Sequence, residues 1–171
     1  SPGFADAVHR LIDTTSIAAS DIQFEITESG FMHERDAAIG KMRELAARGI
    51  RFSIDDFGTG YSSLGQVREF PAVELKLDRS FSHGVHADGA LASLARAAIG
   101  IARSFGMHTV AEGVESRADA TYLARCGCDA IQGHYFYEAL DGEELVRRLK
   151  EDGGRSPRAL QSGELADVVV Y

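Results

Sequence analysis

The stretch Ile50-Arg51-Phe52-Ser53-Ile54-Asp55-Asp56-Phe57-Gly58-Thr59-Gly60 joins an apolar run to two adjacent carboxylates and a glycine-bearing loop. The run 50–54 predicts a strand, and the Asp pair stands where that strand stops. Two neighbouring carboxylates at the end of a buried strand lose solvation and repel each other unless a cation or a basic side chain compensates them. Adjacent Asp residues are also ordinary turn formers, so the pair alone does not establish a metal site.

Ionisable residues end three further strand-like runs of the chain. They are Glu25 and Glu28 after 22–24, Lys76 and Asp78 after 73–75, and Glu112 and Glu115 after 107–111. In parallel α/β folds the carboxyl ends of the strands gather at one face, so groups distant in sequence converge there. Hard divalent cations take oxygen ligands, and a lysine can hold an attacking water or a phosphate. The pattern therefore predicts the edge of a divalent-metal site.

Composition limits what the chain can be. Its 171 residues, 44% hydrophobic and 26% charged, predict one soluble globular domain. The formal net charge of −8 argues against a nucleic-acid polymer as partner, whereas a small anionic substrate remains compatible once cations offset the acidic groups. We find no run of membrane-spanning length and no signal-peptide pattern, so we expect a cytoplasmic protein. Cys126 and Cys128 suit neither a disulfide framework nor a zinc site and are expected to be packing residues.

Helical and strand-like patterns alternate along the chain. Helices are predicted near 4–12, 39–46, 64–68, 91–105, 117–126 and 143–150, and strands at 22–27, 50–54, 73–77, 107–111 and 130–132. This alternation predicts an α/β fold with a parallel sheet, either doubly wound or rolled into a barrel. About five strands are found, whereas a closed barrel needs eight.

Two further expectations concern packing and the end of the chain. Leu91, Leu94, Ala98, Ile101 and Phe105 share one face of the longest predicted helix, so we expect that face to be buried. Leu45 has the periodicity of a core residue in an earlier helix. Structure-breaking residues follow position 152, which predicts a domain over 1–150 and a flexible tail over 151–171. The closing run 168–171 is either disordered or a strand with no evident partner.

Five motifs resemble those of the bacterial EAL domain, over about residues 1–150. They are Glu25-Ile26-Thr27-Glu28, the loop Asp55 to Leu64, Lys76-Leu77-Asp78, Ala111-Glu112-Gly113-Val114-Glu115 and Gln132-Gly133. Five motifs in the right order are far more specific than a lone glycine-rich pattern. The resemblance implies a (β/α)8 barrel of the TIM-barrel type, here incomplete with about five of eight strands. It also implies hydrolysis of cyclic di-GMP to linear pGpG with two Mg²⁺ or Mn²⁺ ions.

The resemblance assigns a role to each matching residue. Glu25 is implied to ligate the first metal, Asp55 to bridge both metals and Asp56 to bind the second. Lys76 is implied to hold the attacking water. Glu112 is implied to sit at the second metal or to activate that water.

Two further residues have implied roles, one of them outside the reaction itself. Gln132 is implied to complete the site from the last strand. Glu28 is implied to fix the loop 57–64, which couples metal binding to dimerisation in the family, so a homodimer is expected. The resemblance also allows a sensor or GGDEF-type domain upstream in a full-length protein.

The departures from the family pattern bear on activity. The signature Glu-Ala-Leu, whose glutamate ligates the first metal, and a ligating asparagine belong upstream of Ser1, so we expect the chain alone to be inactive. Glu138-Ala139-Leu140 has the same spelling but the wrong position, and we interpret Glu138 as an exposed residue before the last helix. The missing strands are also expected to leave open sheet edges near 22–27 and 130–132.

Three hypotheses remain from the sequence. The first is a cyclic di-GMP phosphodiesterase completed by upstream sequence. The second is a degenerate EAL module that binds cyclic di-GMP or a protein partner without catalysis, and the third is a non-functional fragment. Retention of all the available site residues favours the first.

Three other features are weaker candidates for a site. His83, His86 and Asp88 could form a metal cluster, although a solvated turn is the favoured interpretation. His134 could line the substrate site or be an ordinary loop residue. The segment Gly58-Thr59-Gly60 lacks the lysine and the spacing of a phosphate-binding loop.

Overall fold

The computed structural model describes residues 3–27, 35–59, 64–152 and 169–170. Glu28 and residues 60–63 therefore lie outside the described residues. The chain divides into two compact units, residues 1–74 and 75–171. Within the described ranges, no helix combines the length and the apolar character needed to cross a membrane.

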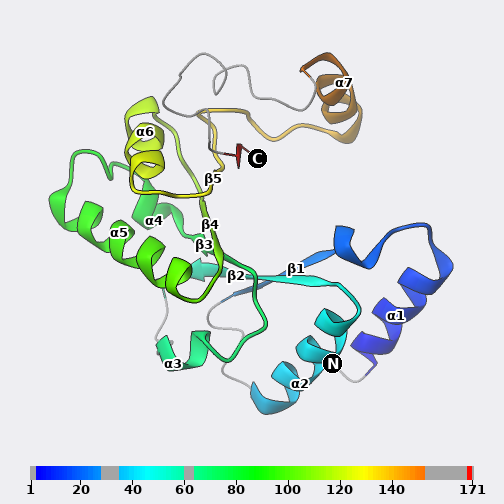
Figure 1. Cartoon of the computed structure of the whole chain (residues 1–171). Helices are drawn as coiled ribbons and strands as arrows, with labels where there is room; N and C mark the ends of the chain where they lie inside the picture. Colours follow the sequence, from blue (N-terminus) through cyan, green and yellow to red (C-terminus); the bar gives the residue numbers. More distant parts are fainter. Residues whose placement is uncertain (1–2, 28–34, 60–63, 153–168, 171) are drawn as a thin grey trace. The chain divides into compact units, whose positions relative to one another are not determined.

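Unit 1 consists of two parallel strands and the helices next to them in the chain (Figure 1). Its elements are α1 (Phe4–Thr14), a short 3₁₀ helix η1 (Ala19–Asp21), β1 (Gln23–Thr27), α2 (Arg35–Ala47), β2 (Arg51–Phe57) and α3 (Leu64–Val67). β1 and β2 pair in parallel register, from Gln23 opposite Arg51 to Thr27 opposite Asp55. α1 and α2 lie on the same side of this strand pair. β2 extends beyond the predicted strand 50–54, because it includes both Asp residues and ends at Phe57.

Aromatic and aliphatic packing holds unit 1 together. The Phe24 ring lies between two others, 5.3 Å from Phe4 and 6.0 Å from Phe52 by ring centroids. From α2, Met42 and Leu45 are buried. Such interdigitated contacts give the core its density and most of its stability.

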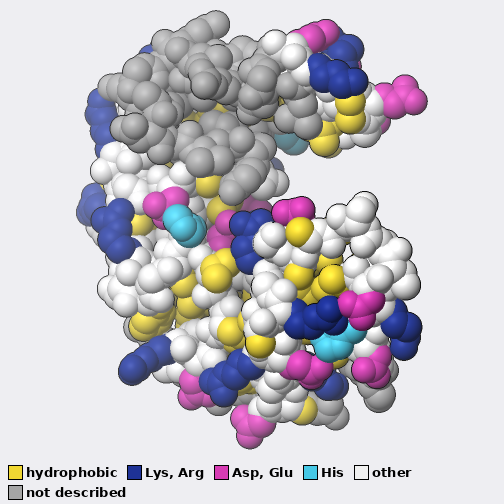
Figure 2. Space-filling model, turned by 45° about the vertical axis from the view of Figure 1, so that its right-hand side comes forward, with side chains coloured by type: hydrophobic (Ala, Val, Ile, Leu, Met, Phe, Trp, Pro, Cys, Tyr) yellow, Lys and Arg dark blue, Asp and Glu magenta, His cyan; other side chains and the backbone are white. Residues whose placement is uncertain are grey.

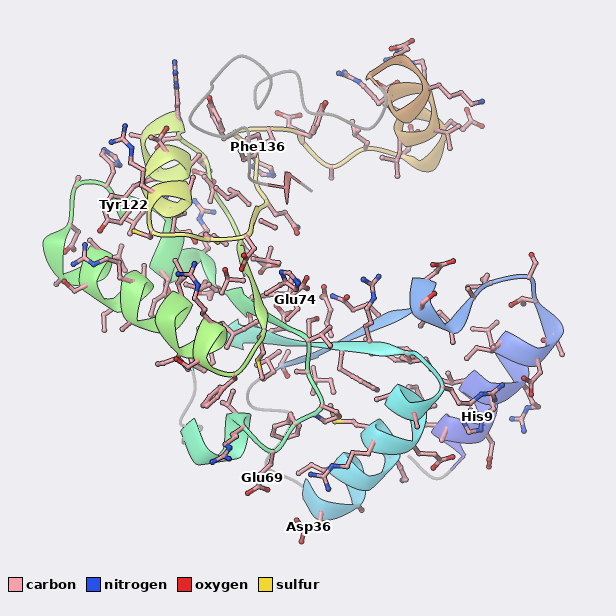
Figure 3. All side chains as sticks on the ribbon, viewed as in Figure 1. His9, Asp36, Glu69, Glu74, Tyr122 and Phe136 are labelled. Carbon is pink, nitrogen blue, oxygen red and sulfur yellow. The ribbon has the colours of Figure 1, made fainter. Side chains whose placement is uncertain are left out.

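An ion pair and a histidine–carboxylate contact join α1 to the end of α2. The Arg48 guanidinium lies 2.7 Å from Asp13, and the His9 ring, labelled in Figure 3, lies 3.7 Å from Glu44. Figure 2 shows basic, acidic and histidine side chains gathered together on the surface that comes forward in that view. Exposed pairs of this kind contribute little to stability.

Unit 2 contains the remaining strands with α5 and α6 beside them (Figure 1). Its elements are β3 (Glu74–Leu77, whose first residue belongs to unit 1), α4 (Arg79–Ser82), α5 (Gly89–Ser104), β4 (His108–Ala111), α6 (Arg117–Arg125), β5 (Ala130–Ile131), α7 (Gly142–Asp152) and β6 (Val169–Val170). The strands lie in the order β3-β4-β5-β6, and β5 runs parallel to both β4 and β6. The α/β class and the parallel strands confirm the predicted architecture.

The predicted buried face of α5 is only partly right, because Ala98 alone among its five residues is buried. Leu94 is 56% exposed, and Leu91, Ile101 and Phe105 are only half-buried. The side chains that α5 buries are Ala92, Ala95, Ala98, Ile99 and Ala102. Alanine side chains are small, so they let the helix approach the sheet closely. Because α5 is apolar around most of its circumference, its large apolar residues predict a different buried face from the one that packs.

The two cysteines and the last strand complete unit 2. Cys126 and Cys128 are free thiols, as expected, and Cys128 is buried. Burial raises the pKa of the Cys128 thiol to about 11, so it packs as an uncharged group at neutral pH. β6 pairs with β5 through Ala130–Val169 and Ile131–Val170, so the expected open edge at 130–132 and the expected lack of a partner for the closing run are both wrong. The domain boundary at 150 and the flexibility of the tail stay predictions.

Asp119 fastens the α4–α5 connection to the start of α6. Its buried carboxylate accepts hydrogen bonds from the backbone N–H groups of Gly84 and His86, each at 3.2 Å, and from the Ser116 hydroxyl at 2.7 Å. The His86 ring nitrogen Nδ1 lies 2.7 Å away. Burial raises the pKa of Asp119, but the hydrogen bonds from His86, Ser116 and the two backbone N–H groups lower it by more, so the net pKa lies below its ordinary value.

Substitution of Leu45 and Leu94 tests these helix faces. Leu45 is 1% exposed, so Leu45→Ala should lower the free energy of unfolding by about 2–5 kcal/mol through cavity formation. Leu94 is 56% exposed, so Leu94→Ala should change it by less than about 0.5 kcal/mol. Urea unfolding followed by circular dichroism measures both. Equal losses in the two variants would contradict the described faces.

The lowered pKa of Asp119 predicts a pH-dependent contribution to stability. A carboxylate whose pKa is lower in the folded state stabilises the fold above its unfolded pKa, and this contribution is lost as the pH falls through the folded pKa. Asp119→Asn should therefore lower the free energy of unfolding by about 1–3 kcal/mol at pH 7. The difference from wild type should shrink as the pH falls below about 4. Urea titrations at several pH values measure it, and a difference independent of pH would contradict the role given to the charge.

Candidate functional site

In unit 1, Glu25 and Asp55 lie on one face of the strand pair. The register places Glu25 opposite Ser53 and Thr27 opposite Asp55. Because side chains alternate along a strand, these four residues share one face of the β1–β2 pair. Asp55 is half-buried and Glu25 is exposed. The structure thus brings together two of the predicted metal ligands through sheet register alone.

The Asp56 backbone departs from extended geometry near the carboxyl end of β2. Its φ of +54° is the only positive value among the described residues other than glycine. Thr59 holds the turn, because its backbone N–H and its hydroxyl both donate to the Asp56 carbonyl, at 3.2 and 2.8 Å. A left-handed conformation costs free energy for most side chains and is more tolerable for Asp or Asn. Such local strain is found where side-chain direction serves a site.

In unit 2, Lys76 and Glu112 form a close ion pair at the carboxyl ends of β3 and β4. The Lys76 Nζ lies 2.6 Å from the Glu112 Oε1, and the two side chains are 8% and 21% exposed. The Glu112 N–H donates to the Leu77 carbonyl at 3.1 Å, which fixes the two strand ends at the same level. The prediction that strand ends bring these residues together is confirmed for this pair.

Gln132 continues the same edge of unit 2 from β5. Its N–H donates to the Ala111 carbonyl at 2.9 Å, and its own carbonyl accepts from the Val114 N–H at 3.1 Å. Its side chain is exposed. Lys76, Glu112 and Gln132 therefore stand at three successive strand ends, β3, β4 and β5.

The predicted ligands, three in unit 1 and one in unit 2, are all oxygen donors of the kind that a hard divalent cation takes. The predicted ligands Glu25, Asp55, Asp56 and Glu112 offer carboxylate oxygens, which Mg²⁺ and Mn²⁺ prefer. Glu112 already meets a cation, the Lys76 ammonium, so its surroundings accommodate positive charge. The residues present fit the metals that the sequence implies.

The weaker candidates resolve into structural roles. His86 meets Asp119, and His83 lies 3.6 Å from the Glu115 Oε2. Asp88 instead caps α5, accepting from the Ala90 and Leu91 N–H groups at 2.8 and 3.1 Å. The three side chains therefore contact three different partners: Asp119, Glu115 and the first turn of α5.

Two loop residues behave as expected. Glu138 is exposed in the segment before α7, as interpreted from the sequence. His134 is exposed as well, beyond Gln132.

Sequence reasoning missed Arg79 and gave Glu115 no role. The Arg79 Nη2 lies 2.9 Å from the Glu115 Oε1. Arg79 belongs to the four-residue helix α4, which is too short to show any periodicity. A usable signal was Asp78, which caps this helix by accepting from the Ser80 N–H at 2.9 Å.

Comparison with known proteins decides the family. The model of the EAL domain matches residues 1–139. The chain belongs to the EAL domain family. EAL domains have a TIM-barrel-like fold, and this chain forms an incomplete version of it, as predicted from the sequence.

The chain is similar in sequence to known proteins and in structure to solved EAL proteins. Over 144 residues the chain is 38% identical to the bifunctional diguanylate cyclase/cyclic di-GMP phosphodiesterase MucR of Pseudomonas aeruginosa, covering 84% of this chain and 21% of MucR. A solved PaMucR phosphodiesterase in complex with c-di-GMP aligns with a TM-score of 0.79 at 38% identity, over 84% of this chain and 58% of that one. A manganese/cy-diGMP complex of Klebsiella pneumoniae BlrP1 aligns with a TM-score of 0.70 at 28% identity, over 77% and 34%. The chain spans about a fifth of the length of the curated relatives it matches.

The backbone of Asp56 predicts a difference between two substitutions. Asp56→Asn and Asp56→Ala remove the same charge, but alanine tolerates a φ of +54° less well. Asp56→Ala should therefore be about 1 kcal/mol less stable than Asp56→Asn in urea unfolding. Equal stabilities would show that Asp56 is not held in this conformation in solution.

Proposed function

We propose that this EAL chain carries part of a phosphodiesterase site that hydrolyses cyclic di-GMP to linear pGpG. The observation that carries the proposal is the Lys76–Glu112 pair, in which a base and an acid lie 2.6 Å apart and largely buried at adjoining strand ends. Desolvated partners of opposite charge at the carboxyl ends of neighbouring strands are candidates for a catalytic site. The relatives named as cyclic di-GMP phosphodiesterases support the substrate class.

The carboxylates would hold two divalent cations, Mg²⁺ or Mn²⁺. Glu25, Asp55, Asp56 and Glu112 are the residues proposed to bind them. When bound, such a pair of ions acidifies a water molecule and stabilises the attacking and leaving oxygens of an in-line displacement. The name of the BlrP1 complex supports manganese as one suitable ion.

The chain's own residues would orient and activate the water. The Lys76 ammonium donates a hydrogen bond to the water oxygen and holds it for attack on phosphorus. The Glu112 carboxylate, already next to Lys76, accepts the proton that the water loses. A new bond forms between the water oxygen and phosphorus, and the bond from phosphorus to a ribose oxygen breaks. The proton that Glu112 accepted passes to the departing ribose oxygen, and the ring opens to a linear dinucleotide. Gln132 is placed at the neighbouring strand end to contact the substrate.

Several finer expectations stay predictions. They are the role of Glu28 at the loop 57–64, the homodimer, the upstream sensor or GGDEF-type domain and the cytoplasmic location. The non-catalytic binding module also stays an alternative, which the experiment below separates from the enzyme.

Hydrolysis of cyclic di-GMP tests the proposal. The chain and a form extended upstream by about three strands are incubated with Mn²⁺ or Mg²⁺, and the linear product is separated by chromatography. We expect product only from the longer form, because the resemblance places two further metal ligands upstream of Ser1. Binding without product in the longer form would contradict hydrolysis and favour the non-catalytic module.

Conservative substitutions in the active form test the assigned carboxylates. Asp55→Asn and Glu112→Gln should each lower kcat by at least about a hundredfold. Glu112→Gln is preferred to alanine, because the glutamine amide oxygen can still accept a hydrogen bond from the Lys76 ammonium, whereas alanine removes the acceptor altogether. The exposed residues Asp21 and Glu143 provide matched controls, Asp21→Asn and Glu143→Gln, which should keep wild-type rates. Full turnover with Mn²⁺ in either site variant would contradict the assignment.

A further inference from the structure

The 112–116 loop, which joins β4 to α6, begins with the proposed catalytic carboxylate. Its first residue, Glu112, is anchored by the Lys76 ion pair and by the bond from its N–H to the Leu77 carbonyl. These contacts fix only the start of the loop. The direction of the Glu112 side chain also depends on where the chain goes next, at Gly113 and beyond.

Arg79 contacts the continuation of this loop in two ways. Its guanidinium forms the 2.9 Å ion pair with Glu115. Its aliphatic stem occupies the space beside Gly113, where an added Cβ would lie 2.6 Å from the Arg79 Cγ and 2.7 Å from its Cβ. Gly113 also has a φ of +63°, so a residue without a side chain is required there for two independent reasons. The loop therefore lies directly on the Arg79 stem.

The segment 132–136 holds the same loop at Val114. The Val114 N–H donates to the Gln132 carbonyl at 3.1 Å, and the Val114 carbonyl accepts from the Tyr135 N–H at 3.0 Å. Gly133 approaches so closely that an added Cβ would overlap the Val114 carbonyl oxygen and nitrogen. Arg79 and this segment together restrict the backbone on the carboxyl side of Glu112.

We propose that Arg79 is a positioning residue, which holds the 112–116 loop so that the Glu112 carboxylate stays directed at Lys76 and the reacting water. This inference rests on the proposed function and adds a residue to it. The Arg79 side chain is 58% exposed, so its ion pair with Glu115 contributes little to global stability. A small displacement of a catalytic group, by contrast, lowers a rate strongly. Arg79 therefore affects turnover far more than it affects folding.

Amide hydrogen exchange in the metal-free 171-residue chain tests the positioning without any activity. In Arg79→Ala the amides of Glu112 and Val114 should exchange at least about tenfold faster than in wild type. The Thr109 amide, which donates to Asp129 at 2.8 Å in the same unit, should keep its wild-type rate. Arg117→Ala, at an exposed arginine that begins α6, is the matched control and should change none of these amides. Unchanged exchange at Glu112 and Val114 in Arg79→Ala overturns the proposal, whether or not the protein proves to be an enzyme.

Kinetics in whichever form hydrolyses cyclic di-GMP provide the second readout. Arg79→Ala should lower kcat about ten- to a hundredfold with KM within about threefold of wild type, because Arg79 does not touch the substrate. Arg79→Met keeps the stem without the charge and should lie between alanine and wild type, and Arg79→Lys should recover kcat to within about threefold. A kcat for Arg79→Ala equal to that of Arg117→Ala overturns the proposal. So does a loss accompanied by faster exchange at Thr109, because that pattern marks general destabilisation.

Failure of the proposed function has a different signature. If neither form yields product while exchange at Glu112 and Val114 rises in Arg79→Ala, the function is wrong and the positioning of the loop is upheld. The two ideas therefore fail independently.

Discussion

The ion pair between Lys76 and Glu112 is the constraint on which unit 2 depends. Moving a charge out of water costs on the order of several kcal/mol unless an opposite charge lies close by. The opposite charges offset that cost for each other, and their 2.6 Å contact fixes the end of β3 against the end of β4. The hydrogen bond from the Glu112 N–H to the Leu77 carbonyl joins the same two strand ends through the backbone. The Lys76–Glu112 pair, which is costly to bury, thus holds the carboxyl ends of β3 and β4 side by side, and the loops that follow these two strands start from there.

Glycine permits the loops above this pair to pack tightly. Gly113 and Gly133 lie where a side chain would overlap Arg79 and the Val114 backbone. A methyl group at either position would push two segments apart. The sequence Glu112-Gly113-Val114-Glu115 therefore places a residue without a side chain between two charged residues. The Arg79 stem occupies the space that Gly113 leaves.

Local sequence patterns predicted most elements but not every packing face. The strand leading to Asp55 and the strand leading to Glu112 were evident because β-branched and aromatic residues stop abruptly at charged ones. The face of α5 was not, because a helix rich in alanine and leucine offers two apolar faces, and only the closely packed sheet selects the alanine face. The charged residues of the site could be predicted individually. The pairing of Arg79 with Glu115 could not, because it joins a four-residue helix to a loop 36 positions later, and no periodicity reports such a contact.

The pairing of Val169 and Val170 with β5 decides what else can bind there. A strand offers two hydrogen-bonding edges, and β5 has β4 on one and β6 on the other. Any other segment that adds to the sheet at this place must therefore compete with the end of the same chain, whose covalent attachment keeps it at high local concentration. Val169 and Val170 thus cover the edge of β5 that β4 leaves open.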